Sequence, residues 1–234
     1  MANDPDKLAD VWAWVRDPGT VRGWIIDAND GIIATAGILQ GFAGAGAGDR
    51  LLIFTATAAT IAGGISAGGA KWAEDASERE SQRRLARLEL ADIEQNPEGE
   101  IAELTAHWCA RGLEPELAHV VAERLTAHDA LSAQLESEYG FDKPMPALIP
   151  VLSGLGTWLA FVGGAMIPLL ITYFAPLNIE TWAILGAVIV ALTLTAVASS
   201  RAAHLSAAST LGRSLIVGAL TLSISYVAAE LLLN

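Results

Sequence analysis

The sequence predicts an all-α membrane protein with five transmembrane helices and a cytoplasmic three-helix insert between the second and third of them. Composition is the first reason: 53% of the residues are apolar, 17% are charged and the mean hydropathy is +0.42. Such a chain is too apolar for an ordinary soluble domain of 234 residues. The second reason is the clustering of the acids, because 17 of the 26 Asp and Glu residues lie within residues 72–146.

Five apolar stretches are long enough to cross a bilayer, whose hydrocarbon core needs about 20 apolar residues per helix. The first two are joined by a short polar turn at residues 48–50, which predicts a membrane hairpin. The stretches are residues 31–48 with an approach from residue 23, then 51–70, 147–174, 179–199 and 211–233.

The predicted domains follow from these stretches. They are an N-terminal amphipathic segment (1–21), transmembrane helices 1 and 2 (22–71), an acidic helical domain (72–146) and transmembrane helices 3 to 5 (147–234). Within the first segment, residues 8–16 form an amphipathic pattern whose Trp12 and Trp14 suit a membrane interface. Residues 17–19 are expected to end that helix. An interfacial anchor is the simpler interpretation, and a gating or recognition role is the alternative.

The positive charges predict the orientation. With the N-terminus in the cytoplasm, every Lys and Arg except Arg50 lies on the cytoplasmic side together with the acidic domain, as the positive-inside rule requires. The turn at 48–50, residues 175–178 and Asn234 then lie outside. Residues 1–20 are polar and acidic, unlike a cleavable signal peptide. The single Cys109 is expected on the cytoplasmic side with no disulfide partner in the chain.

Three polar residues stand where the first transmembrane helix enters the bilayer. In one interpretation Asn29, Asp30 and Gly31 form a cap or turn, and the helix begins after them. In the other, a helix from about Arg22 places Asp30 about 12 Å along its axis. An acid at that depth is a functional candidate. Asp27 shares its helix face, and a proton or a cation would relieve the two charges.

Glycines predict close helix packing. Residues 37–41 and 64–68 both have the GxxxG pattern, which lets helix backbones approach closely in lipid. Tight contacts between helices, within the chain or between subunits, are therefore expected.

The acidic domain predicts three helices. They are expected at residues 72–95, 97–111 and 114–139, ended by Asn96 and Pro97, by Gly112 and by Gly140. Carboxylates recur three residues apart along the first two helices, which places each pair on one face. Converging faces would form an oxygen-rich site for a divalent cation. The proposed ligands are Glu89 with Asp92, Glu100 with Glu103, and Glu136 and Glu138 from the third helix.

An ordinary solvated acidic face, neutralised by the neighbouring Arg residues, is the alternative interpretation of this domain. The four residues His107, Cys109, His119 and His128 lack the spacing of zinc ligands. They are interpreted as structural or surface residues.

Several segments together resemble the vacuolar iron transporter (VIT) family. They are VRGWIIDANDGIIATAG, GGISAGGAKW, NPEGE, SEYGF and GGAMIPLL, in this order, and the resemblance covers about residues 20–233. It implies a homodimer of five-span subunits that moves ferrous iron, in some members manganese, out of the cytosol in exchange for protons. It further implies that the carboxylate-rich domain collects metal and that the conduction path lies at the dimer interface.

The resemblance also implies roles for particular residues. Asp30 matches the pore aspartate of the family. The positions of the metal-collecting acids match Glu89, Asp92, Glu100, Glu103 and Glu138.

The chain departs from the family pattern in the second transmembrane helix. Ser66 and Ala67 replace a Ser-Met pair, and Ala59 replaces a glutamate, so a soft thioether and a hard carboxylate are both missing. Met166 is a candidate replacement for the thioether, or else a packing residue. Elsewhere, Leu135 stands where an acid is expected, and Lys71 would repel a cation unless Asp30 or Glu74 pairs with it.

The functional hypothesis is a multi-pass transporter that exports divalent iron or manganese by proton antiport through Asp27, Asp30, Ser66 and Met166. Its partners would be a second copy of the chain, the lipid bilayer and divalent cations. Its location would be the inner membrane of a prokaryote or a vacuolar-type membrane of a eukaryote. The alternatives are a divergent relative that has lost iron conduction and carries another small solute or only binds metal, and a scaffold without ligands. The sequence has no nucleotide motif, nucleophilic triad or nucleic-acid-binding patch, so neither an enzyme, an organic cofactor nor a nucleic-acid partner is expected.

Overall fold

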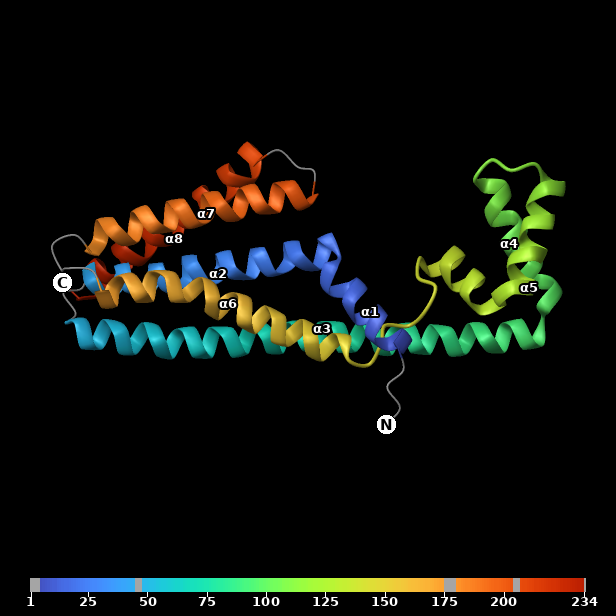
Figure 1. Ribbon diagram of the computed structural model, residues 1–234, viewed down its shortest axis with the longest axis horizontal. Coiled ribbons are helices and arrows are strands. Elements are labelled where there is room, and N and C mark those ends of the chain that lie inside the picture. Colours follow the sequence, from blue (N-terminus) through green and yellow to red (C-terminus); the bar gives the residue numbers. More distant parts are fainter. Residues whose placement is uncertain (1–4, 45–47, 175–179, 204–206, 234) are drawn as a thin grey trace. The chain divides into compact units, whose positions relative to one another are not determined.

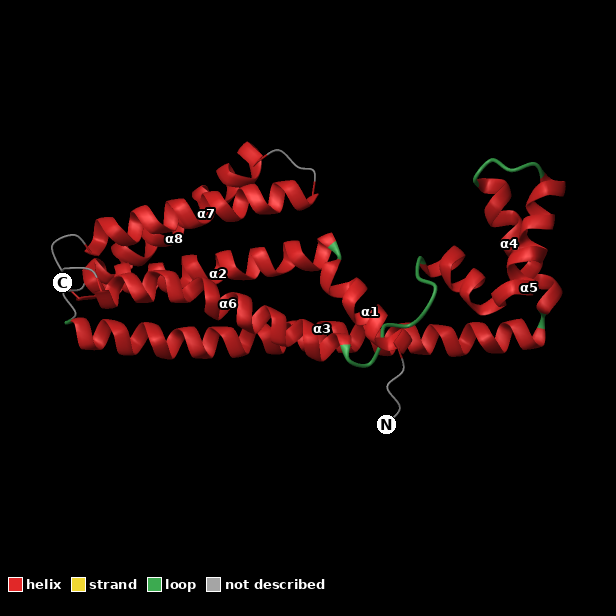
Figure 2. Ribbon diagram, in the orientation of Figure 1, coloured by secondary structure: helices red, strands yellow, loops and turns green. Residues whose placement is uncertain are grey.

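The computed structural model describes residues 5–44, 48–174, 180–203 and 207–233. Every regular element within these ranges is an α-helix, which confirms the all-α prediction (Figure 2). The predicted outer turn at residues 175–178 and Asn234 lie outside the described residues. The helices, labelled in Figure 1, are α1 (Pro5–Arg16), α2 (Pro18–Gly44), α3 (Asp49–Gln95), α4 (Pro97–Ala110), α5 (Pro115–Tyr139), α6 (Ile149–Phe174), α7 (Glu180–Ala203) and α8 (Ala207–Leu233).

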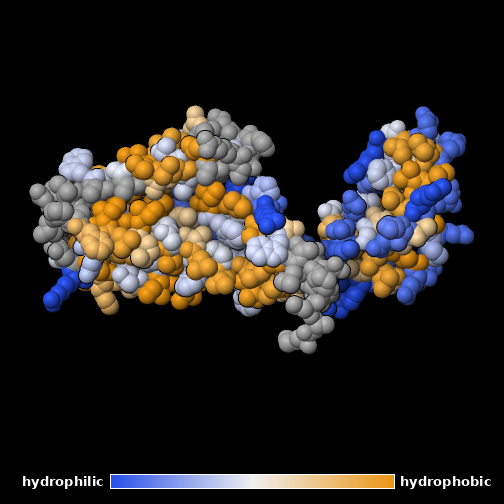
Figure 3. Space-filling view, viewed as in Figure 1, coloured by the Kyte–Doolittle hydropathy of each residue, from blue (hydrophilic) through white to orange (hydrophobic). Residues whose placement is uncertain are grey.

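The helices form two compact units. Unit 1 contains the chain up to Ala73 and from Leu148 onward, and unit 2 contains residues 74–147. Helix α3 therefore contributes its first part to unit 1 and its last part to unit 2. Apolar side chains dominate the visible face of unit 1, whereas strongly hydrophilic side chains are concentrated on unit 2 (Figure 3).

Among the residues that the structure describes, two helices are long and apolar enough to cross a bilayer, α3 within Arg50–Gln95 and α6 over Ile149–Phe174. Shorter apolar stretches lie in α7 and α8, at Ile184–Val197 and Leu211–Ser225. This agrees with a helical membrane protein. The number of five spans remains a prediction.

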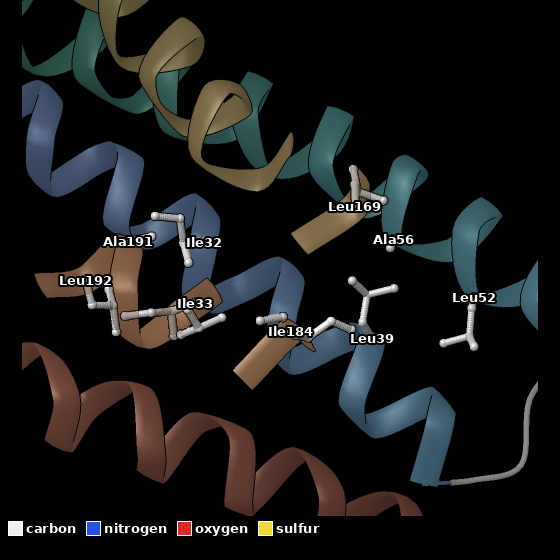
Figure 4. Close-up of a cluster of buried hydrophobic side chains, with 11 residues drawn as sticks. Ile32, Ile33, Leu39, Leu52, Ala56, Leu169, Ile184, Ala191 and Leu192 are labelled. Atoms are coloured by element: carbon white, nitrogen blue, oxygen red, sulfur yellow. The ribbon is translucent and has the colours of Figure 1, made fainter. Parts of the chain in front are cut away.

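Helix α2 is the central helix of unit 1. It packs against α6, α7 and α8, and α1 touches it as well (Figure 1). Residues 31–41 of α2 are almost entirely buried. Their apolar side chains form one cluster with residues of three neighbouring helices (Figure 4). The cluster contains Ile32, Ile33, Ala36 and Leu39 of α2, Leu52 and Ala56 of α3, Leu169 of α6, and Ile184, Val188, Ala191 and Leu192 of α7.

Glycines bring α2 and α6 into backbone contact. A Cβ atom added to Gly31 would collide with the backbone of Phe161, and one added to Gly164 would collide with the backbone of Ala28. Since lipid provides no hydrophobic drive for helices to associate, this close van der Waals packing is what holds the two helices together.

Both GxxxG pairs also lie at helix contacts, which confirms the tight packing predicted for them. Gly37 and Gly41 pack against Thr221 and Ser225 of α8. Gly64 and Gly68 pack against α6, where a Cβ on Gly68 would lie 2.6 Å from the backbone oxygen of Gly154. These contacts are all within unit 1.

The start of α2 corrects two expectations. Asn29, Asp30 and Gly31 lie inside the helix, so the cap or turn interpretation is wrong. Residues 17–19 end α1, but they also begin α2, because Asp17 accepts a hydrogen bond from the backbone N–H of Thr20 at 2.9 Å. That bond is typical of an N-cap, and Pro18 occupies the first helical position that suits proline.

Helix α3 corrects a third expectation. The second transmembrane stretch and the first helix of the acidic domain were expected to be separate, but they form one helix, Asp49–Gln95. The physical reason is that residues 70–75 contain neither proline nor glycine, so nothing in the chain interrupts the backbone hydrogen bonds there.

The remaining helices of unit 2 end as predicted. Gly112 follows α4 with φ +99° and Gly140 follows α5 with φ +77°, conformations that glycine adopts without strain. Helix α5 contains a break that was not predicted. At Asp129 the backbone is extended, and its carboxylate accepts hydrogen bonds from the backbone N–H and hydroxyl of Ser132 at 3.1 and 2.8 Å. Asp129 therefore caps a second helical segment inside α5.

Adjacent glycines of α6 offer a matched test of the α2–α6 contact. We expect Gly164→Ala to destabilise the protein by about 1–3 kcal/mol, because overpacking forces the backbones apart. A Cβ on Gly163 meets nothing within 4 Å, so Gly163→Ala should not have this effect. Thermal unfolding in detergent measures the difference, and equal midpoints for the two variants would contradict the packing described above.

Candidate metal-binding site and membrane carboxylates

Three carboxylates of unit 2 converge. One oxygen from each of Glu89, Glu100 and Glu138 lies within 4.8 Å of the other two. The three residues come from α3, α4 and α5 respectively. Glu89 and Glu100 are only 4% and 8% exposed, whereas Glu138 is exposed. This separation and these ligand types suit a divalent cation that prefers oxygen ligands.

The turn between α3 and α4 brings Glu89 and Glu100 together. Helix α3 ends at Gln95, and the Asn96 side chain accepts a hydrogen bond from the backbone N–H of Gly99 at 3.2 Å. Pro97 occupies the first position of α4, so the chain reverses within very few residues. Glu100 therefore lies in the first turn of α4, where the helix dipole favours a negative charge.

Gln134 fixes α5 against this turn. Its side chain is buried, and its amide nitrogen donates a hydrogen bond to the backbone oxygen of Glu100 at 2.7 Å. Gln134 lies on the segment of α5 that Asp129 caps, as does Glu138. Leu135, the residue found where an acid was expected, is fully buried in the core of unit 2.

Burial and mutual repulsion keep the paired carboxyls protonated to a higher pH than usual. Burial, then the charge of Glu138 and a hydrogen bond with Glu100, together raise the pKa of Glu89 to about 7. Burial also raises the pKa of Glu100, although its hydrogen bond with Glu89 opposes that shift. Close carboxyls of this kind titrate as a coupled pair.

Two oxygens of the cluster have no hydrogen-bond partner. Glu89 Oε1 and Glu100 Oε2 are buried and unpaired within the described residues. A buried acceptor without a partner costs free energy, and a bound cation would remove that cost. This observation points to a ligand more directly than the abundance of acids does.

Asp92, Glu103 and Tyr139 surround the three carboxylates. The charge of Asp92 acts on Glu89 and Glu100, and that of Glu103 acts on Glu100. Asp92 and Glu103 are exposed. Tyr139 forms a hydrogen bond with Glu138, which raises the pKa of its phenol to about 12 together with burial and the neighbouring negative charges. Tyr139 carried no signal in the sequence beyond its position next to Glu138.

The structure does not bring Glu136 to this cluster. Glu136 and Glu138 are two residues apart on α5, which separates them by about 200° around the helix. Glu136 instead lines a separate cavity of about 430 Å³ between α4 and α5, with Leu104, His107, Trp108 and Arg111 among its other lining residues.

The polar residues of α2 point to different neighbours. Asp27 accepts a hydrogen bond from the hydroxyl of Thr157 on α6 at 2.8 Å, and Asn29 accepts one from Thr195 on α7 at 2.5 Å. Asp30 is exposed. The hydroxyls of Thr157 and Thr195 therefore hold α2 from two sides.

Ser66 of α3 and Met166 of α6 are both exposed in unit 1. Met166 lies about 200° around α6 from Gly164, the residue that contacts α2. Its side chain is therefore on the face of α6 directed away from α2, outside the packed core.

Comparison with known proteins identifies the family. The sequence pattern of the VIT family matches residues 21–230, almost the whole chain. This chain belongs to the VIT family. The resemblance predicted from the sequence is thereby confirmed, and family membership and the apolar helices together make the chain a membrane protein.

Three relatives illustrate the similarity. A vacuolar iron transporter of Acanthamoeba castellanii is 29% identical over 170 residues, which cover 73% of this chain and 60% of that protein. A vacuolar iron transporter of Centaurea cyanus is 30% identical over 175 residues, covering 74% and 70%. Vacuolar iron transporter 2 of Oryza sativa subsp. japonica is 30% identical over 158 residues, covering 67% and 64%. The match with the first relative spans less than two thirds of that protein's length.

The raised pKa of Glu89 gives this member of the VIT family a testable pH dependence. Its protonation contributes stability that is complete below pH 4.5 and is lost as the pH rises through about 7. Glu89→Gln should therefore stabilise the metal-free protein at pH 8 and leave its stability at pH about 4 unchanged. Thermal unfolding of the full chain in detergent at both pH values measures this difference.

Metal affinity should change in the opposite sense over the same pH range. Since a cation competes with the protons of Glu89 and Glu100, the affinity of the full chain for Mn²⁺ should rise between pH 5 and 7 and be weakened at least tenfold by Glu89→Gln. Titration calorimetry measures it. Glu136→Gln is the control, because Glu136 lines the other cavity. Equal losses in the two variants would contradict the assignment of the cluster.

Proposed function

We propose that the chain is a transporter that removes ferrous iron or manganese from the cytosol in exchange for protons. The observation that carries the proposal is the convergence of Glu89, Glu100 and Glu138 with two buried, unpaired oxygens. The names of the relatives, vacuolar iron transporters, support iron as the cargo. In this proposal the chain crosses the membrane five times, with the N-terminus and unit 2 in the cytoplasm. The membrane would be the inner membrane of a prokaryote or a vacuolar-type membrane of a eukaryote.

Metal capture is the first step of the proposed mechanism. The net charge of −12 and the concentration of acids in unit 2 raise the local concentration of cations. A divalent cation then replaces the proton held by Glu89 and Glu100 and takes Glu138 as a third ligand. Asp92 and Glu103, at the margin of the cluster, strengthen this attraction by their charge.

Transfer through the membrane is the second step. Asp30 is the proposed acceptor in unit 1, because its carboxylate is exposed beside the buried part of α2. In hydrocarbon such a group would be costly, so we propose that it lines a hydrated path. We further propose that a second copy of the chain completes this path, with Ser66 and Met166 as additional oxygen and sulfur ligands.

The absence of two expected ligands favours a second candidate function. Ala59 and Ala67 occupy positions where the family resemblance implies a carboxylate and a thioether. In that alternative the chain binds metal at unit 2 but conducts another small solute or none.

Uptake of ferrous iron into proteoliposomes separates these functions. We expect uptake by the native chain, and we expect Asp30→Asn to reduce uptake to the level of empty liposomes because it removes the charge that accepts the cation. Asp142→Asn, which changes an exposed acid outside both sites, is the control. Size-exclusion chromatography verifies assembly, because a correctly assembled Asp30→Asn variant elutes at the same volume as the native chain.

Two results would count against the transporter. No uptake by the correctly assembled native chain would leave metal binding alone. Undiminished uptake by Asp30→Asn would remove Asp30 from the conduction path.

A further inference from the structure

Asp27 lies one helical turn before Asp30 and has different surroundings. Its side chain is partly buried, and one of its oxygens accepts the 2.8 Å hydrogen bond from Thr157 on α6. The backbones of α2 and α6 are in close contact just beyond this point, at Gly31 and Phe161. The partners are therefore held in place by the packing of the two helices and not only by the hydrogen bond itself.

Charged side chains of two helices act on Asp27. Asp30 of α2 is a like charge and Lys71 of α3 is an opposite charge. Helix α6, which supplies Thr157, contains no charged residue. Thr157 offers only a neutral hydroxyl, and the positive charge of Lys71 opposes a divalent cation at Asp27. A proton is the smaller ligand and needs only the one carboxylate.

Thr157 suits both protonation states of Asp27. The Thr157 hydroxyl donates to one oxygen of the carboxylate, and it can continue to donate to that oxygen when a proton adds to the other one. A group that must bind and release a proton repeatedly within a packed helix pair needs such a partner.

We propose that Asp27 is the proton-binding carboxylate of the exchange, and that Thr157 is its positioning residue. Asp30 remains the acceptor of the metal ion. The proton adds to the Asp27 oxygen that does not bond to Thr157 and neutralises the carboxylate. When the proton dissociates again, the carboxylate regains its negative charge. The role of Asp27 in transport rests on the proposed function, whereas proton binding by Asp27 does not.

Infrared spectroscopy of the purified chain tests proton binding without transport. A pH titration should show the C=O band of a protonated carboxyl that is absent from Asp27→Asn and present in Asp30→Asn. Thr157→Val should move this band to higher frequency, since the carbonyl loses its hydrogen-bonding neighbour, and Thr157→Ser should restore it. A band that is unchanged in Asp27→Asn would overturn the proposal.

Thr195→Val is the matched control for Thr157→Val. It removes the same kind of interhelical hydrogen bond, to Asn29 of the same helix, without touching Asp27. The proposal requires that Thr195→Val leaves the carboxyl band in place. An equal shift of the band in both variants would show a general change of α2 packing and would overturn the role of Thr157.

Transport measurements then test whether proton binding by Asp27 is coupled to iron uptake. In proteoliposomes, an imposed pH gradient should accelerate iron uptake by the native chain severalfold and should not accelerate it in Asp27→Asn. Uptake by Asp27→Asn that still responds to the gradient would overturn the coupling role. Failure of the native chain to transport any metal would instead overturn the proposed function, and the infrared result would still decide whether Asp27 binds a proton.

Discussion

The backbone contact between α2 and α6 is the constraint on which unit 1 depends. Gly31 and Gly164 permit it, and no larger residue fits at either position without moving a helix. Because α2 is enclosed by other helices from residue 31 to residue 41, it has little freedom to rotate or slide. The rotation of this single helix decides that Asp27 faces Thr157, that Asn29 faces Thr195 and that Asp30 remains uncovered. Packing by small residues thus determines which of the two carboxylates is partly buried and which is exposed.

In unit 2, helix caps and one hydrogen bond position the carboxylates, in place of the glycine contacts of unit 1. Its three converging carboxylates come from three helices, and their approach depends on a cap at Asn96, a proline at the next position and the bond from Gln134 to the Glu100 backbone. These local features hold two buried acids together in spite of their repulsion. The mutual repulsion of these carboxylates would favour a bound cation.

Local chemistry explains which features were predictable. Pro97, Gly112 and Gly140 mark helix boundaries through their own backbone preferences, so the sequence alone located them. The acids on either side of Asn96 and Pro97 predicted that Glu89 and Glu100 would meet. The continuity of α3 and the break at Asp129 were missed, since the first has no local signal and the second lies in a helix-favouring segment. Thr157 and Thr195 were missed because their partners are 130 and 166 residues away in the chain. Contacts at that separation come from tertiary packing.

The interruption of α5 at Asp129 decides which changes in the length of this helix would move Glu138. Glu138 belongs to a helical segment that starts afresh at Asp129, so its angular position is counted from that residue and not from Pro115. One residue inserted or deleted before Asp129 leaves the register of Glu138 intact. The same change after Asp129 turns Glu138 by about 100° and carries it away from its two companions. A change of length in the first half of this helix therefore spares the position of Glu138, whereas one in the second half does not.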